Sequence, residues 1–191
     1  MKKIVLALLL LTAVTTVAIA DDNSAGPGIY IKPSAALDFG IGNYFRGGAF
    51  GGTVMFSTGG LWIGAEVIGD IDAGYNIVNF PIFLDIGLGH GFWIMVGQTF
   101  APADPYLRTG NAQVIMKYAN FPNTFGLGAA PIGLDLGGTW LRFYSELTYT
   151  IIATKSASAA DDQLVESTYV LPNILLGLKL YIGVSLELKV L

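Results

Sequence analysis

Residues 29–41 read IYIKPSAALDFGI, and this stretch decides the fold class because it alternates between two kinds of side chain. Its odd positions, from Ile29 to Ile41, form one apolar series, whereas its even positions include Lys32 and Asp38. Successive side chains of a β-strand point to opposite faces, so a period of two predicts a strand with one apolar and one polar face.

The same alternation recurs through the rest of the chain. It is found at residues 50–56, 61–71, 78–88, 92–100, 124–136, 141–151 and 170–182. We therefore expect an all-β fold, a closed antiparallel up-and-down transmembrane β-barrel of eight strands. Ten strands remain an alternative, since residues 170–191 are long for one strand. That alternative needs a turn near Tyr181 to Gly183 and a further strand at Ala112 to Tyr118.

The composition excludes several classes of protein. The chain has 191 residues, of which 53% are hydrophobic and 13% charged, with no cysteine and a formal net charge of -4. Disorder needs low hydrophobicity, a disulfide scaffold needs cysteines, and binding to a phosphate backbone needs a basic excess. We therefore expect a single folded domain that does not bind nucleic acid.

The N-terminus has the pattern of a secretory leader. Lys2 and Lys3 form a positive segment, residues 4–11 are apolar, and Ala18-Ile19-Ala20 resembles a cleavage site. The expected organisation is a cleaved signal peptide at 1–20, a short periplasmic segment at 21–27 and the barrel at 28–191.

The connections between the alternating segments differ in length. Residues 57–60, 89–91 and 137–138 are short and glycine-rich, whereas residues 42–48, 72–76, 101–123 and 154–167 are longer and more polar. Outer-membrane barrels have short periplasmic turns and longer external loops, so both termini are expected to be periplasmic. This orientation places the charged loop residues at the cell surface: Arg46, Arg108, Lys117, Lys155, Asp161, Asp162 and Glu166.

A two-faced sheet is also compatible with a soluble sandwich or a lipocalin-like barrel, in which the apolar face points inward. Two features favour lipid on the outside. The charged residues of the expected strands all lie on the parity opposite the apolar series, and the polar face is poor in charge for a surface in water. An Arg or Lys facing lipid near the midplane costs about 2–4 kcal/mol, which explains such segregation. The expected location is thus the outer membrane of a diderm bacterium, with outer-membrane lipid as a partner.

The polar face should fill the barrel interior, because eight strands leave just enough room for side chains. The expected charge network in the lumen comprises Lys32, Asp38, Glu66, Asp85, Asp135, Arg142, Glu146 and Lys179. Buried charges need partners, which favours a structural polar plug. A narrow solute path, in which Arg142 and Glu146 exchange partners, is the alternative.

Motifs for catalysis or cofactor binding are absent from the sequence. The single histidine, His90, lies in a tight turn predicted at the periplasmic end, across the membrane from the acids and hydroxyls of the outer loops. Histidine and cysteine are not clustered at the spacing of metal ligands. We expect no enzymatic activity, no cofactor and no metal.

The leader, the eight alternating segments and the asymmetry of turns and loops resemble the small outer-membrane β-barrel superfamily, which includes the OmpA transmembrane domain, OmpX and OmpW. This resemblance implies insertion by the barrel-assembly machinery. It also suggests a second function, a narrow channel or transporter for small or apolar solutes, as in OmpW-type barrels.

The first functional hypothesis is a structural or adhesin-like role through the external loops. Residues 101–123 form the longest of these loops and contain Tyr106 and Arg108, residue types that are enriched in binding hot spots. These two residues are the candidate contacts for an external ligand or host protein.

Overall fold

The computed structural model describes residues 26–40, 44–72, 77–89, 91–101, 106–109, 112–158 and 177–191. All of its extended elements are β-strands, and they form two sheets. The barrel strands are β1 (Gly28–Gly40), β2 (Tyr44–Ser57), β3 (Leu61–Asp72), β4 (Ile77–Leu88), β5 (Phe92–Phe100), β8 (Thr124–Asp135), β9 (Thr139–Thr150) and β11 (Leu178–Lys189). The second sheet contains β6 (Tyr106–Thr109), β7 (Ala112–Tyr118) and β10 (Ile152–Ser158).

The first sheet is a closed barrel in the order β1-β11-β9-β8-β5-β4-β3-β2, and every neighbouring pair is antiparallel. The first and last strands close it, with Ile31 opposite Leu188 and Phe39 opposite Leu180. The backbone N–H of Ile29 donates to the carbonyl of Leu191, so the two chain ends of the barrel meet at the same rim. The predicted fold class of eight up-and-down strands is thereby confirmed.

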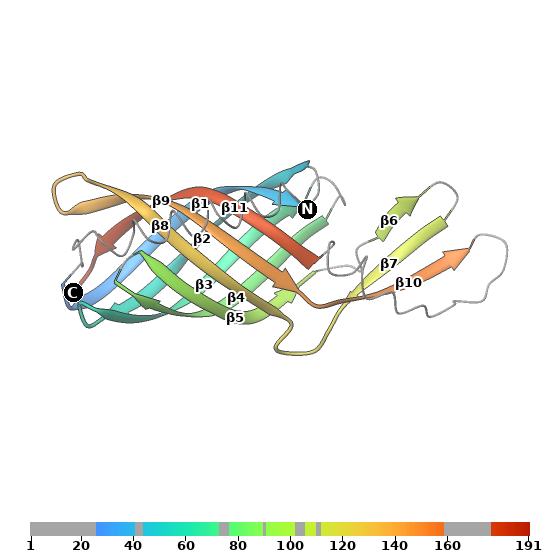
Figure 1. Cartoon of the computed structure of the whole chain (residues 1–191), viewed down its shortest axis with the longest axis horizontal. Coiled ribbons are helices and arrows are strands. Elements are labelled where there is room, and N and C mark those ends of the chain that lie inside the picture. Colours follow the sequence, from blue (N-terminus) through green and yellow to red (C-terminus); the bar gives the residue numbers. More distant parts are fainter. Residues whose placement is uncertain are drawn as a thin grey trace, which may run out of the picture.

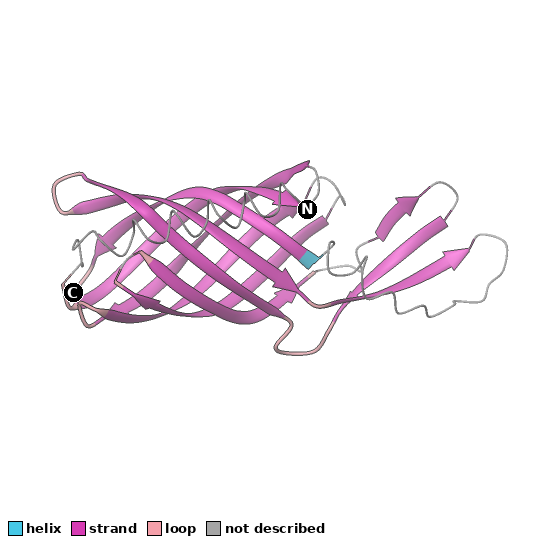
Figure 2. Cartoon of the chain, viewed as in Figure 1, coloured by secondary structure: helices cyan, strands magenta, loops and turns pink. Residues whose placement is uncertain are grey.

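The second sheet is an extension of one hairpin beyond the barrel (Figure 1). Strands β8 and β9 pair as far as Thr124 opposite Thr150, and β7 and β10 pair from Tyr118 opposite Ile152. Figure 2 shows these strands projecting past the end of the barrel opposite the β8–β9 turn. We call β6, β7 and β10 the extension.

The apolar side chains of the barrel strands point outward. Val54 is 57% exposed, Leu84 46% and Ile182 49%, whereas their neighbours Thr53, Asp85 and Tyr181 are buried. This orientation is opposite to that of a lipocalin-like barrel or a sandwich, whose apolar residues face inward. The buried core instead lies inside the barrel and includes large aromatic residues as well as charges.

Glycines provide the space for two buried tryptophans. Trp62 lies opposite Gly87 on the neighbouring strand, and Trp93 lies opposite Gly128. A Cβ atom at Gly87 would fall 2.1 Å from Cε2 of Trp62, and one at Gly128 would fall 2.0 Å from Cε2 of Trp93. Each indole therefore covers the backbone of the adjacent strand and helps to fill the lumen.

The ten-strand alternative is wrong, although one of its two conditions is met. Ala112–Tyr118 is a strand, but it pairs with β6 and β10 outside the barrel. Strand β11 continues without interruption through Tyr181 and Gly183, because both residues pair with β1 and β9. Its ladder begins at Leu178, and the earlier part of the predicted segment, residues 170–176, lies outside the described residues.

The expected loop at 42–48 is also corrected. Strand β2 begins at Tyr44, and Gly47 and Gly48 already pair with Asp38 and Leu37 on β1. The expected leader at 1–20, most of the segment at 21–27, and His90 lie outside the described residues. Within the described ranges, no helix is long and apolar enough to cross a membrane.

Candidate functional site: a polar network in the barrel interior

The interior of the barrel contains charged side chains from six of its eight strands, all except β5 and β8. Those that are buried or nearly so are Lys32, Arg46, Arg142, Lys179, Asp38, Glu66, Asp70, Asp72, Asp85, Glu146 and Glu187. They form three groups along the barrel, which we call the mouth group, the central group and the turn-end group. The mouth group is next to the extension and the turn-end group is near the short turns.

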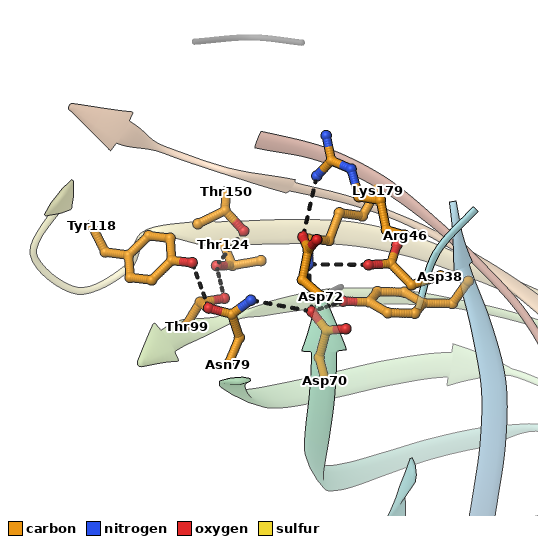
Figure 3. A network of polar contacts seen from close by, with 11 residues as sticks. Asp38, Arg46, Asp70, Asp72, Asn79, Thr99, Tyr118, Thr124, Thr150 and Lys179 are labelled. Carbon is orange, nitrogen blue, oxygen red and sulfur yellow. Dashed lines mark hydrogen bonds and ion pairs between the residues drawn. The ribbon is translucent and has the colours of Figure 1, made fainter. Parts of the chain in front are cut away.

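The mouth group is organised around Lys179 of β11 (Figure 3). Its ammonium Nζ lies 3.2 Å from Oδ2 of Asp38 and 3.3 Å from Oδ2 of Asp72, and it donates a hydrogen bond to Asp70. Arg46 forms a second ion pair with Asp72, with 3.6 Å between Nη1 and Oδ2. Asp70 and Asp72 are two residues apart on β3, so strand alternation points both carboxylates into the lumen.

A chain of hydrogen bonds joins the mouth group to the extension. The hydroxyl of Tyr118, the last residue of β7, donates to Oδ1 of Asn79 at 2.6 Å, and Nδ2 of Asn79 donates to Oδ2 of Asp70 at 3.4 Å. Burial raises the pKa of Tyr118 to about 12, so this phenol stays protonated and remains a donor at neutral pH. Tyr118 thereby connects a strand of the extension to a carboxylate inside the barrel.

Three threonine hydroxyls form a second chain beside Tyr118 (Figure 3). Oγ1 of Thr124 lies 2.7 Å from Oγ1 of Thr99 and 3.1 Å from Oγ1 of Thr150, across three adjacent strands. Asn123 fixes this chain, because its amide bonds the backbone of Thr99 and Ala119 and its Oδ1 accepts from Thr124 at 2.8 Å. Asn123 is fully buried, so these bonds hold the five residues 119–123 between β7 and β8 against the barrel rim.

A small cavity lies between these two chains. Its lining includes Asp70, Asn79, Tyr118, Thr150 and Lys179. The volume open to the centre of a water molecule is about 20 Å³, enough for about one or two waters. Pro81, Phe83 and Ile152 also line the cavity, which is therefore a small pocket of mixed polar and apolar lining, much smaller than a pore for organic solutes.

The central group has more carboxylates than cations. Glu66, Asp85 and Glu146 all interact electrostatically with Lys32. The ammonium of Lys32 also lies over the ring of Trp93, 4.4 Å from its centroid, and 5.7 Å from the centroid of Trp62. Thr53 donates to Oε1 of Glu66 at 3.4 Å. The two cation–π contacts and the electrostatic attraction of three carboxylates together place Lys32 at the centre of the barrel.

The turn-end group joins Arg142 of β9 to Glu187 of β11, with 3.6 Å between Nε and Oε2. The guanidinium also lies 4.8 Å from the ring centroid of Trp140. Glu146, the residue with which Arg142 was expected to exchange partners, belongs to the central group around Lys32. Arg142 and Glu146, the two residues predicted to exchange partners along a solute path, therefore lie in different parts of the network.

Of the predicted lumen residues, all but Asp135 point into the barrel. Asp135 is an exposed residue at the end of β8, so its assignment to the lumen is wrong. Its Oδ1 accepts the backbone N–H groups of Gly137 and Gly138, both at 2.9 Å, in the turn to β9. The alternation of β8 points the Asp135 side chain inward, but Asp135 lies at the rim of the barrel. A side chain that points inward at the rim is not necessarily buried.

Four lumen charges were not among the predicted lumen residues: Arg46, Asp70, Asp72 and Glu187. Arg46 was expected in a surface loop, and its inward position follows from the earlier start of β2. Asp72 and Glu187 point to the same face as Asp70 and Lys179, because each is an even number of residues further along the same strand. The alternation would have included both residues if the predicted segments had reached the ends of these two strands. Tyr106 and Arg108 are both in β6, opposite Ile115 and Gln113, but their side chains lie outside the described residues.

Two of the other expected surface charges lie in the extension. Lys117 and Lys155 are in β7 and β10, whereas Asp161, Asp162 and Glu166 lie outside the described residues. In the part of the chain that is described, no group of three or more His, Cys, Asp or Glu residues is arranged to hold a metal ion. The interior network is thus a set of ion pairs, hydroxyl chains and aromatic contacts.

Comparison with known proteins identified no matching family model, no similar curated protein and no similar solved structure.

Proposed function

We propose that this protein is an integral outer-membrane β-barrel with a closed, structural interior, and that it acts through the extension outside the membrane. The observation that carries the proposal is that apolar and charged side chains occupy the opposite positions to those in an ordinary soluble protein. Apolar side chains cover the outside of a closed barrel, and charges lie inside it. This arrangement suits a lipid bilayer for two reasons. Closure of the barrel pairs the backbone N–H and C=O groups, and the charged side chains avoid the hydrocarbon.

The membrane proposal is tested by refolding into lipid vesicles. The mature chain is mixed with vesicles of dilauroyl phosphatidylcholine, floated on a density gradient and treated with protease. The expected result is a fragment that floats with the lipid and is protected over the barrel strands. A folded chain that stays at the bottom of the gradient would refute the proposal.

The interior supports a structural role. The mouth group, the central group and the turn-end group occupy the lumen together with Trp62, Trp93 and Tyr181. Ion pairs buried at this depth are costly to break, because a separated partner would stay desolvated. Such an interior favours a stable anchor over an open conduit.

The extension is the part proposed to contact an external ligand or host protein. It continues the β8–β9 hairpin beyond the barrel, and Tyr118 and Asn123 join its base to the barrel rim. Tyr106 and Arg108 of β6 are the proposed contacts.

Alanine substitution of both should abolish adhesion of cells displaying the protein to a host extracellular matrix. Substitution of Gln113, on the neighbouring strand β7, serves as the control. Unchanged adhesion of the Tyr106/Arg108 variant would remove these residues from the proposal.

A narrow channel is the second candidate function, because the lumen is polar and contains a cavity at its mouth. Single-channel recording in planar bilayers separates the two functions. A silent wild type and a silent Arg142→Ala variant are expected for the plug. Discrete openings of the wild type that change with Arg142→Ala would favour the channel.

A further inference from the structure

The hairpin that joins the extension to the barrel contains a large bulge. Five residues, 119–123, stand between β7 and β8, whereas only Ile151 stands between β9 and β10. Ile151 bonds both ends of the longer segment. Its N–H donates to the carbonyl of Asn123 at 2.7 Å, and its carbonyl accepts from the N–H of Ala119 at 3.2 Å. A bulge bends its strand, so the extension can pivot against the barrel here unless other contacts fix its direction.

Two amide side chains fix the bulge itself. Nε2 of Gln98 donates to the carbonyl of Ala119 at 3.3 Å, and Nδ2 of Asn123 donates to the same carbonyl at 3.0 Å. Both bonds end on a residue of the bulge, before the strands of the extension begin. They hold the bulge at the barrel rim, but they leave the direction of β7 and β10 to contacts made by those strands.

Two residues at the base of the extension reach the barrel interior. Ile152, the first residue of β10, is buried and lines the mouth cavity together with Tyr118 of β7. Apolar burial has no preferred direction, so Ile152 does not define an angle. Tyr118 does define one, because its hydroxyl forms a directional hydrogen bond of 2.6 Å to Oδ1 of Asn79 on β4.

The chemistry of the mouth group determines how Asn79 is oriented (Figure 3). The carboxylate of Asp70 is held beside the ammonium of Lys179 and can only accept hydrogen bonds. Asn79 therefore turns its Nδ2 to Oδ2 of Asp70, at 3.4 Å, and its Oδ1 to Tyr118. A flipped amide would set its oxygen against the carboxylate and its NH₂ against the phenol. Asn79 is buried, so loss of either partner would be destabilising.

We propose that the bulge at 119–123 is a hinge between the barrel and the extension, and that the hydrogen-bond chain from Tyr118 through Asn79 to Asp70 is a latch that holds this hinge at one angle. Asn79 is thus a positioning residue for the extension, although it lies in the barrel. The direction in which β6 is presented depends on the mouth group. This inference concerns the angle of the extension alone, and it holds whatever the extension binds.

The test measures a distance across the hinge. The chain has no cysteine, so Ala157→Cys on β10 and Val78→Cys on β4 provide two specific sites for spin labels. Double electron–electron resonance is recorded on the full mature chain refolded in detergent micelles. The doubly labelled parent should give a single narrow distance distribution. Tyr118→Phe, which removes the latch hydroxyl and keeps the ring, should replace it with a broad distribution.

Tyr144→Phe is the matched control, because it removes the hydroxyl of another buried tyrosine inside the barrel. Its distance distribution should equal that of the parent. Asn79→Ala should broaden the distribution as Tyr118→Phe does, and the double variant should broaden it no further, because both substitutions interrupt one chain. Tryptophan fluorescence verifies that each variant has a folded barrel.

Three results would overturn the proposal. The first is a narrow distribution that survives in Tyr118→Phe, which would mean that other contacts fix the angle. The second is a parent distribution that is already as broad as that of Tyr118→Phe, which would mean that the hinge is not held. The third is equal broadening in Tyr144→Phe, which would mean that the barrel has loosened as a whole.

Discussion

At the scale of single residues, the packing of the interior depends on pairs in which a tryptophan lies opposite a glycine. Trp62 and Trp93 fill the lumen because their partners on the adjacent strands are Gly87 and Gly128. Each indole lies where a Cβ atom would otherwise stand, and the neighbouring positions are already occupied by core side chains. The barrel therefore has little tolerance for added volume at these glycines.

Gly87→Ala should destabilise the barrel by about 1–3 kcal/mol, the usual cost of overpacking a filled core. The reason is that the new methyl group overlaps the Trp62 ring, 2.1 Å from its Cε2 atom. Urea unfolding in vesicles, followed by tryptophan fluorescence, measures the change. Gly60→Ala is the control, since no heavy atom lies within 4 Å of a Cβ at that position. Equal stability of the two variants would contradict the explanation.

A second prediction at this scale concerns Lys179. Lys179→Met should cost about 3–5 kcal/mol of unfolding free energy, because it leaves the buried carboxylates of the mouth group without their shared cation. Adding Asp70→Asn should recover part of the loss. Lys189→Met, the same change at an exposed position of the same strand, should cost no more than about 1 kcal/mol, because the ammonium of Lys189 has an exposed cation–π contact with Tyr30. Unfolding in urea compares the three variants, and an equal loss at both lysines would refute the prediction.

At the scale of elements, the hairpins at the short-turn end are set by local interactions. The β8–β9 turn contains Gly137 with φ of 85° and Gly138 with φ of 98°, a left-handed conformation that favours glycine. Asp135 accepts both of their backbone N–H groups. An aspartate that bonds the backbone two or three residues further on is a common means of fixing a tight turn.

Asp135→Ala should therefore lower the unfolding free energy by about 1 kcal/mol, the net value of hydrogen bonds of this kind at the surface. Asp135→Asn should have a smaller effect, because its amide oxygen can still accept the two N–H groups. Unfolding midpoints in urea distinguish the variants. If Asp135 belonged to the lumen network instead, both substitutions would cost several times more.

At the scale of the whole molecule, the outward apolar surface determines the solvent in which the barrel is stable. Leu84→Arg, in the middle of β4, should cost about 2–4 kcal/mol and slow refolding into vesicles, because the membrane proposal places this outward position against hydrocarbon. Leu136→Arg is the control, since Leu136 is also an exposed leucine but lies in the β8–β9 turn at the rim. Refolding yield is measured by flotation with the vesicles. A barrel that gains solubility and stability from Leu84→Arg would not be a membrane protein.

The sequence predicted most of the barrel because strand alternation is a local property. Residues 61–71 and 78–88 point alternate side chains to opposite faces whatever else the chain does, so the segregation of Glu66 and Asp85 from Leu84 was visible without coordinates. The short turns were visible for the same reason, since glycines such as Gly137 and Gly138 allow the required backbone angles.

The sequence by itself thus predicted eight alternating segments, their faces and most of the inward charges, but it left ten barrel strands as an alternative. Only the tertiary structure decided which charges meet, because partners such as Lys179 and Asp70 are 109 residues apart and come together through barrel closure. The tertiary structure also decided where strands end. Arg46, predicted in a loop, lies in the lumen, and Asp135, predicted in the lumen, lies beside a turn. Residues 112–118, considered as a further barrel strand, belong to the extension. The physical reason is that alternation fixes the direction of a side chain, whereas its depth and its partners depend on the register between strands distant in sequence.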